Sequence, residues 1–190
     1  MPRRPRRSAC LGLLLACSAA SCGGDGDAYW TASAEGRIVL DPGGAETPLV
    51  AVLPFTAGGL YAPDGRAAFG WSLADAEAEG ERTVEVFVGV QLFEANAAGT
   101  YSARPTAPGQ PFAMLDLVTG PASLPREDWV AEAGGLTIQS WRCAPQTVVD
   151  VSIDAEFVHP SAADARIHFT GRLTQRQVGD LAVPVCNPLE

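Results

Sequence analysis

The chain has 190 residues and a formal net charge of −9, from 13 basic and 22 acidic side chains. Four of the bases lie in the first seven residues, which contain no acid, so the rest of the chain carries nine bases against 22 acids and a net charge of −13. A surface this acidic repels nucleic acids and anionic lipid headgroups, and neither is expected as a partner.

The start of the chain has the composition of a secretory signal. Arginines between Arg3 and Arg7 precede an apolar run over residues 9–20, and the small residue Ser21 follows. The run has 12 residues, whereas a helix needs about 20 to cross a hydrocarbon core. Residues 1–21 are therefore predicted to be a cleaved signal peptide.

The cysteine after this run resembles the lipobox of bacterial lipoproteins, in which small or aliphatic residues precede a cysteine that becomes the lipidated N-terminus. Cys22 follows Ala19-Ala20-Ser21 and keeps the whole apolar run upstream, so it is the favoured attachment site. Cys17 follows Leu14-Leu15-Ala16, which fits the motif better but shortens the run, and is the alternative. The resemblance implies a membrane anchor of the palmitate type. An ordinary cleaved signal without lipid is the other interpretation.

Residues 22–27 are rich in glycine and aspartate and predict a flexible tether. Residues 28–190 then form one extracytoplasmic domain. The residue after the lipidated cysteine would be Gly23 or Ser18 rather than aspartate. By analogy with enteric lipoproteins, this implies anchoring in the outer membrane of a bacterial cell envelope, facing the periplasm or the cell exterior.

The domain shows short apolar runs between turn residues and almost no helical period, which predicts an all-β fold. Residues 41–44 (Asp-Pro-Gly-Gly) mark an early turn, and Phe69, Trp71 and Leu73 alternate in a strand. A strand from Thr83 to Phe93 should bury one face, formed by Val84, Val86, Val88, Val90 and Leu92. We expect an antiparallel β-sandwich or open barrel built from meander hairpins.

Two further hairpins are predicted. Gly134-Gly135 suits a two-residue turn that needs positive φ, and it places Trp129 on the apolar face of a hairpin and Trp141 on its polar face. A second hairpin over residues 149–173 alternates apolar and polar side chains on both strands. The predicted register pairs oppositely charged residues across it, namely Glu156 with Arg166, Asp154 with His168, and Asp150 with Arg172.

Cys143 and Cys186 are the two cysteines left in the domain. In an oxidising compartment they are expected to form a disulfide, which fastens the C-terminal segment to the sheet. The chain-entropy model gives about 4 kcal/mol for a loop of this length. Two free thiols or a metal pair are the alternative, but histidines are lacking nearby.

Three short motifs resemble known proteins: Gly99-Thr100-Tyr101, Gly135-Leu136-Thr137-Ile138, and residues 169–173 (Phe-Thr-Gly-Arg-Leu). They are similar to small bacterial lipoprotein domains of unknown function, which are antiparallel meanders behind a glycine-rich tether. The resemblance covers residues 83–174. It implies the fold and the location, and it brings no activity with it.

The sequence lacks a nucleophile with a positioned base, and His159 and His168 are its only histidines. His168 is explained as the partner of Asp154, and a metal site would need three or four ligands. We predict no catalytic residue, no cofactor and no metal site, and expect that the protein is not an enzyme. The acidic run over residues 75–81 is typical of a solvated loop, and a carboxylate-based hydrolase is the least favoured alternative.

Aromatic residues provide the candidate binding patch. Trp71 and Trp129 fall on apolar faces and are expected in the core, whereas Phe87, Phe93 and Trp141 fall on the half-polar or polar faces of their strands. The expected function is that of a lipid-anchored, non-catalytic binding or assembly protein with a protein partner. A glycan-binding β-sandwich module is the alternative, and the scarcity of glutamine and asparagine favours the protein partner.

Overall fold

The computed structural model describes residues 30–41, 43–52, 57–61, 66–75, 83–93, 95–142 and 147–177. The predicted signal and tether, Cys17, Cys22, Cys143 and Cys186 lie outside these residues. No helix in the described ranges has the length and apolar character needed to span a membrane. The described ranges contain the strands β1 (Trp30–Val39), β2 (Thr47–Ala51), β3 (Ala57–Tyr61), β4 (Arg66–Asp75), β5 (Glu85–Phe93), β6 (Gly99–Ser102), β7 (Phe112–Thr119), β8 (Trp129–Arg142), β9 (Val148–His159) and β10 (Ala162–Gln177).

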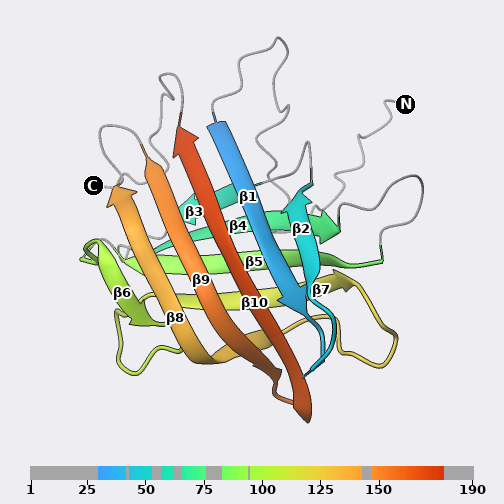
Figure 1. Ribbon diagram of the computed structural model, residues 1–190. Helices are drawn as coiled ribbons and strands as arrows, with labels where there is room; N and C mark the ends of the chain where they lie inside the picture. Colours follow the sequence, from blue (N-terminus) through green and yellow to red (C-terminus); the bar gives the residue numbers. More distant parts are fainter. Residues whose placement is uncertain are drawn as a thin grey trace, which may run out of the picture.

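The strands pair antiparallel in a closed ring (Figure 1). The order around the ring is β1, β2, β4, β5, β7, β8, β9, β10 and back to β1. β3 continues along β4 beyond β2, and β6 pairs with β8 outside this path. The prediction of an all-β, antiparallel, single-domain fold built from hairpins is confirmed. The sequence left open whether the sheet closes into a barrel. The pairing of β2 with β4 shows that it does.

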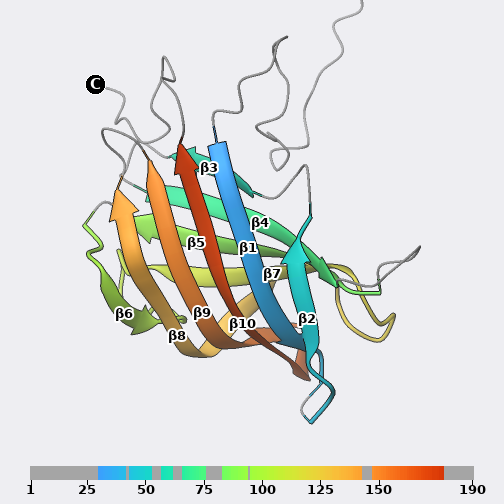
Figure 2. The same cartoon turned by 45° about the horizontal axis from the view of Figure 1, so that its top comes forward.

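The ring is flattened into two walls that run across each other. β8, β9, β10, β1 and β2 form one wall, and β3, β4, β5 and β7 form the other behind it (Figures 1 and 2). Two short ladders join the walls: β2 meets β4 at residues 49–51, and β7 meets β8 at Met114 and Leu115.

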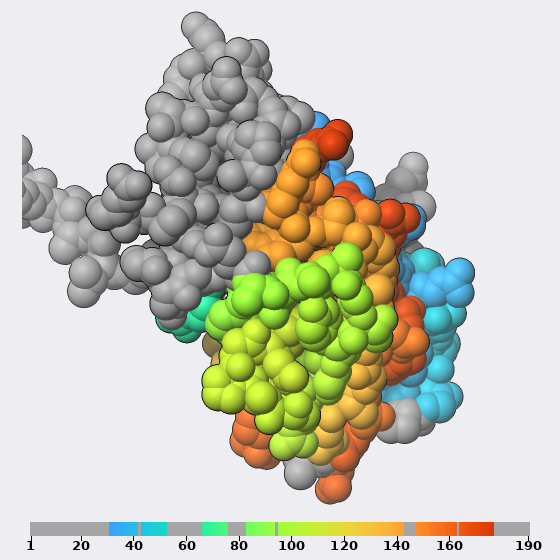
Figure 3. Space-filling model, turned by 90° about the vertical axis from the view of Figure 1, so that its left-hand side faces the viewer, coloured from blue at the N-terminus to red at the C-terminus, as the bar shows by residue number. Residues whose placement is uncertain are grey.

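Ala103, just after β6, fills the gap beside the second ladder. Its N–H donates to the Gly134 carbonyl, and its own carbonyl accepts from the Ala113 N–H. Figure 3 shows the segment that contains β6 lying against β8 on this side of the molecule. The two walls are thereby sealed to each other through the main chain.

The interior is a packed core rather than a channel. Its largest fully buried side chains are Trp71, Trp129, Phe157 and Phe169. The predicted apolar face of β5 is buried from Val86 to Leu92, and so is Val84 just before the strand. Strands that alternate between the core and solvent fill a barrel of this size with side chains.

The hairpin predicted at 129–141 is wrong, because β8 is one strand that pairs with β9 over most of its length. Gly134 does have a positive φ of 98°, but it lies inside the strand, next to a bulge between Ala131 and Ala133. A bulge inserts one residue and bends the strand. The glycine pair therefore marks the bend of a long strand rather than a turn.

A second bulge between Ile138 and Ser140 explains why Trp141 does not lie on the polar face predicted for it. Each bulge shifts the alternation by one residue. After two shifts Trp141 packs edge-on against Phe69, with ring centroids 5.4 Å apart, and its Nε1–H donates to the Phe93 carbonyl at 3.1 Å.

The hairpin of β9 and β10 has the predicted faces but a register two residues away from the predicted one. Glu156 lies opposite His168 and Asp154 opposite Thr170. The chain turns tightly after His159, and residues 163–165 then leave the ladder, which sets the shift. The predicted charge pairs form diagonally, because long side chains on a twisted sheet reach the next row: Arg172–Asp150 at 2.8 Å, His168–Asp154 at 2.9 Å and Arg166–Glu156 at 3.3 Å.

Candidate interaction face

The outer surface of the barrel has two chemically different faces. The wall of β8, β9, β10 and β1 presents polar side chains, and most of its charged groups pair across strands. Besides the three diagonal pairs, Arg166 contacts Glu132 at 3.1 Å, and Arg37 contacts Glu46 at 3.1 Å. A surface in which bases and acids satisfy one another is a solvated face rather than a docking site for an apolar partner.

The opposite wall, together with the start of β8 that pairs with β7, presents apolar side chains to solvent. We use the term apolar face for the outward residues Phe87, Phe112, Met114, Val118 and Val130 of β5, β7 and the start of β8. Met114, Val118 and Val130 are 38%, 54% and 47% exposed. Met114 and Val130 lie directly opposite each other across the β7–β8 ladder, so the group crosses from strand to strand.

Two paired glycines shape the apolar face. Gly70 of β4 lies opposite Gly89 of β5. A Cβ atom at Gly70 would collide with the ring of Phe87, and one at Gly89 would lie 2.7 Å from Cγ of Met114. The missing side chains let Phe87 and Met114 lie flat across the neighbouring strands. The surface is therefore smooth and apolar at Gly70 and Gly89, where a β-branched side chain would protrude.

One carboxylate lies within the apolar face, and it is held by the main chain. Asp116 lies opposite Phe87, and its Oδ1 accepts a hydrogen bond of 2.9 Å from the Asp128 N–H. Asp128 has a φ of 65° and ends the loop before β8. The exposed side chains of Arg126, Glu127 and Asp128 thus lie in the loop that leads to Val130, and the two acids outweigh the one base, so this edge of the face has a net negative charge.

A hollow of about 410 Å³ lies near Phe112. It is lined by Phe93, Phe112 and the loop over residues 105–110. Side chains fix the loop: Asn96 accepts from the Phe93 N–H at 2.8 Å and donates to the Gly109 carbonyl at 3.0 Å. The apolar face therefore ends in a concave region framed by ordered main chain.

The structure places Phe87 of the predicted binding patch on the apolar face and Phe93 at the hollow beside Phe112. Phe87 belongs to the apolar face and is half-buried over Gly70, while Phe93 is half-buried at the other end of β5. Trp141 is partly buried, packs against the core and donates a hydrogen bond to the Phe93 carbonyl. Trp71 and Trp129 are fully buried, as predicted.

Met114, Val118 and Val130 were not predicted from the sequence as exposed residues. A usable signal was present in residues 112–118, which are apolar at every position except Asp116. A strand of an antiparallel sheet with one solvated face alternates apolar and polar residues. This nearly continuous apolar run therefore indicated that both faces of the strand are largely apolar.

The groups considered for chemistry have structural roles. His159 Nδ1 accepts from the Ser161 N–H at 3.1 Å, and its ring packs edge-on against Trp129. His168 is held by Asp154. Within the described ranges, no three His, Cys, Asp or Glu side chains come close enough together to hold a metal ion. Comparisons of the chain with protein-family models, with curated proteins and with solved structures found no match.

Proposed function

We propose that the chain is a non-catalytic binding protein, held to the bacterial cell envelope by a lipid on Cys22 (or Cys17), that docks a protein partner on the apolar face. The observation that carries the proposal is the group of large apolar side chains exposed on adjacent strands, Met114, Val118 and Val130. Exposed apolar clusters on a folded domain mark interaction surfaces. The anchor and the location rest on the signal-like N-terminus.

The charge of the chain selects the kind of partner. A net charge of −13 without the leader repels both a second copy of the chain and an anionic lipid surface. The carboxylates of Glu127 and Asp128 at the edge of the face attract bases. The partner is therefore a protein with an apolar patch bordered by lysine or arginine, and its association should weaken as salt rises.

Catalysis receives no support from the carboxylates on the barrel wall. Asp150, Asp154 and Glu156 are each neutralised by an arginine or lie against His168 on the outer surface. An aromatic sugar platform receives no support either, since Trp71 and Trp129 are in the core. Binding through the apolar face is therefore the function that this arrangement favours.

Photo-crosslinking in cells that naturally make the protein tests the proposal. The photoreactive residue p-benzoylphenylalanine is placed at Val118 or Val130, and at the exposed Thr100 or Ser102 on β6 as controls. We expect one protein to be crosslinked from Val118 and Val130 only. Purified, it should bind the Val118→Asp/Val130→Asp variant at least about tenfold more weakly, and Thr100→Asp/Ser102→Asp unchanged.

Three outcomes would overturn the docking proposal: crosslinks to lipid alone, crosslinks to a second copy of the chain alone, or equal crosslinking from the control positions. The anchor is tested on the same material. The intact mass of protein extracted from membranes in detergent should correspond to a triacylated chain that begins at Cys22 or Cys17. A mass that begins at another residue without lipid rejects the anchor and leaves the docking result standing.

A further inference from the structure

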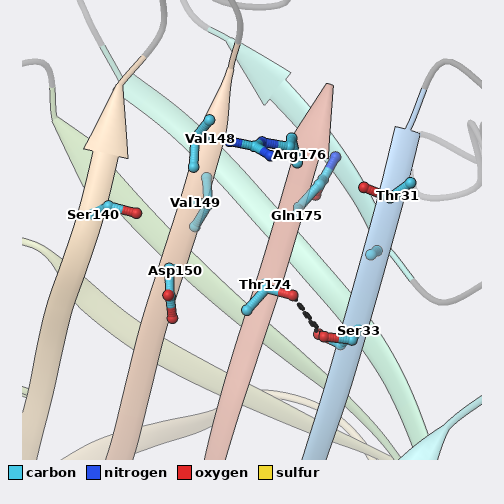
Figure 4. Close-up of a pocket in the computed structure, with 10 residues that line it drawn as sticks. Thr31, Ser33, Ser140, Val148, Val149, Asp150, Thr174, Gln175 and Arg176 are labelled. Atoms are coloured by element: carbon cyan, nitrogen blue, oxygen red, sulfur yellow. Dashed lines mark hydrogen bonds between the residues drawn. The ribbon is translucent and has the colours of Figure 1, made fainter. Parts of the chain in front are cut away.

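The polar wall carries a hollow of about 390 Å³ near one end of its strands (Figure 4). Three cross-strand rows of β1, β10 and β9 line it, joined by Ser140 of β8. The residues of the three rows, in that strand order, are Thr31, Arg176 and Val148; Ala32, Gln175 and Val149; and Ser33, Thr174 and Asp150. The hollow is thus built on the regular part of the sheet.

The floor of the hollow is main chain and its walls are polar side chains. Val149 and Gln175 of the middle row are buried, with their side chains on the inner side of the sheet. The rows on either side point outward, because successive residues of a strand face opposite ways. Hydroxyl groups therefore surround the floor, from Thr31, Ser33, Ser140 and Thr174, and Ser33 Oγ and Thr174 Oγ1 lie 2.6 Å apart (Figure 4).

The lining of the hollow holds two charged residues, Asp150 and Arg176. Asp150 is neutralised by Arg172 through two hydrogen bonds of 3.0 and 2.8 Å. Arg176 is exposed and makes no ion pair with any described residue, and its side chain extends towards Val148 (Figure 4). Arg142 lies opposite Val148 on the other side, is exposed, and is likewise without an ion pair in the described ranges.

Arg176 and Arg142 thus lie on β10 and β8, on either side of Val148 of β9, and neither pairs with an acid in the described ranges. Their Cα atoms are about 10 Å apart, twice the spacing of neighbouring strands. Both side chains are long enough to converge above Val148. Guanidinium groups bind carboxylates through two parallel hydrogen bonds, and hydroxyl groups exchange hydrogen bonds with the hydroxyls of a sugar.

We propose that this hollow binds an anionic saccharide, with Arg176 and Arg142 on its carboxylate and with Ser33, Ser140 and Thr174 on its ring hydroxyls. A simple inorganic anion would contact the arginines and leave most of the hydroxyl groups around the floor without a ligand. The site lies on the polar wall, away from the apolar face, so it is independent of the proposed protein partner.

The test is an NMR titration of the ¹⁵N-labelled domain with a linear trimer of galacturonic acid. The matched ligand is its methyl ester, which keeps the rings and loses the charge, and sodium acetate is the simple anion. We expect the acid trimer to shift the amide signals of residues 31–33, 148–150 and 174–176, and the ester and acetate to bind at least about tenfold more weakly.

Arg176→Gln and Arg142→Gln should each raise the dissociation constant about tenfold. Arg104→Gln is the control, because Arg104 is an exposed arginine of the β6–β7 loop that makes no ion pair in the described ranges. Any one of four results would overturn the proposal: no shift with the acid trimer at millimolar concentration, equal binding of the ester, equal binding of acetate, or an equal loss in Arg104→Gln. All variants leave the core untouched, so an unchanged amide spectrum verifies the fold.

Discussion

At the scale of single residues, Asp75 links the end of β4 to the residues just before β5. It is 7% exposed, and its Oδ2 accepts hydrogen bonds from both the N–H and the Oγ1–H of Thr83. The side-chain hydrogen bond from Thr83 is the main cause that lowers the pKa of Asp75, against the opposing effect of burial. The folded state thus stabilises the charged form of Asp75 more than the unfolded state does.

This gives Asp75 a definite pH dependence. A lowered folded-state pKa adds stability above the unfolded value, about 3.9, and that stability is lost as the pH falls through the folded pKa. Asp75→Asn should lower the free energy of unfolding by about 1–3 kcal/mol at pH 7 and by less at pH 3. Urea unfolding at both values measures this. Asp164→Asn, at an exposed carboxylate, is the control, and an equal deficit of Asp75→Asn at pH 3 and pH 7 would contradict the assignment.

Residue pairs were predictable to the extent that they depend on charge. The sequence identified the partners Asp150–Arg172 and Asp154–His168, because complementary polar side chains alternate on the same face. It missed their diagonal placement. The register depends on where the chain leaves the ladder after His159, and nothing in the residue types of 160–165 distinguishes a tight turn with a bulge from a longer turn.

At the scale of elements, the bend of β8 depends on one glycine. Gly134 has a φ of 98°, and a Cβ atom there would collide with the Asp154 carbonyl and lie 2.6 Å from Cα of Ala155. These are main-chain atoms of the paired strand and cannot move aside alone. Gly135, the next residue, has its nearest neighbour at 3.7 Å.

Gly134→Ala should therefore lower the free energy of unfolding by about 2–4 kcal/mol, from backbone strain and from the displaced β9 strand. Gly135→Ala should change it by less than about 1 kcal/mol. Thermal or urea unfolding of the two variants makes the comparison. Similar losses in both variants would show that the bend does not depend on the close approach at Gly134.

Strand existence was predictable and strand extent was not. Alternation identified β5 and the buried faces of β9 and β10, because β5, β9 and the part of β10 from Arg166 onward each keep one phase. β8 changes phase twice, so the alternation of Trp129 and Ala131 does not continue to Leu136. If a single phase of alternation is assumed for each strand, a strand with two bulges is interpreted as two shorter strands.

At the scale of the whole molecule, the barrel is unevenly sealed. β9 and β10 pair from residues 148 and 176 up to the turn at His159, whereas β2 and β4 pair only at residues 49–51. Local opening occurs first where few hydrogen bonds and buried contacts must break. Hydrogen exchange measured by mass spectrometry should show peptides over residues 47–52 exchanging at least about tenfold faster than those over 151–157 and 167–173. Uniform protection around the ring would contradict this order.

Closure of the barrel could not be predicted from the sequence. The ladders that complete the ring, at residues 49–51 and at Met114–Leu115, are too short to carry a pattern of their own. Their partners come from separate hairpins, so no local signal pairs them. The exposed apolar face escaped prediction for a related reason: a strand that is apolar on both sides is also what a buried central strand looks like.

The pairing of Trp30 with Gln177 makes the first strand of the barrel a neighbour of the last. The eight strands of the ring therefore have a cyclic order, and the ladder contains no break that marks where the described fold begins. A backbone that opened in the loop between β6 and β7 and joined β10 to β1 would keep every strand pairing. Several different linear orders of the strands along the chain would therefore give the same ring of strand pairings.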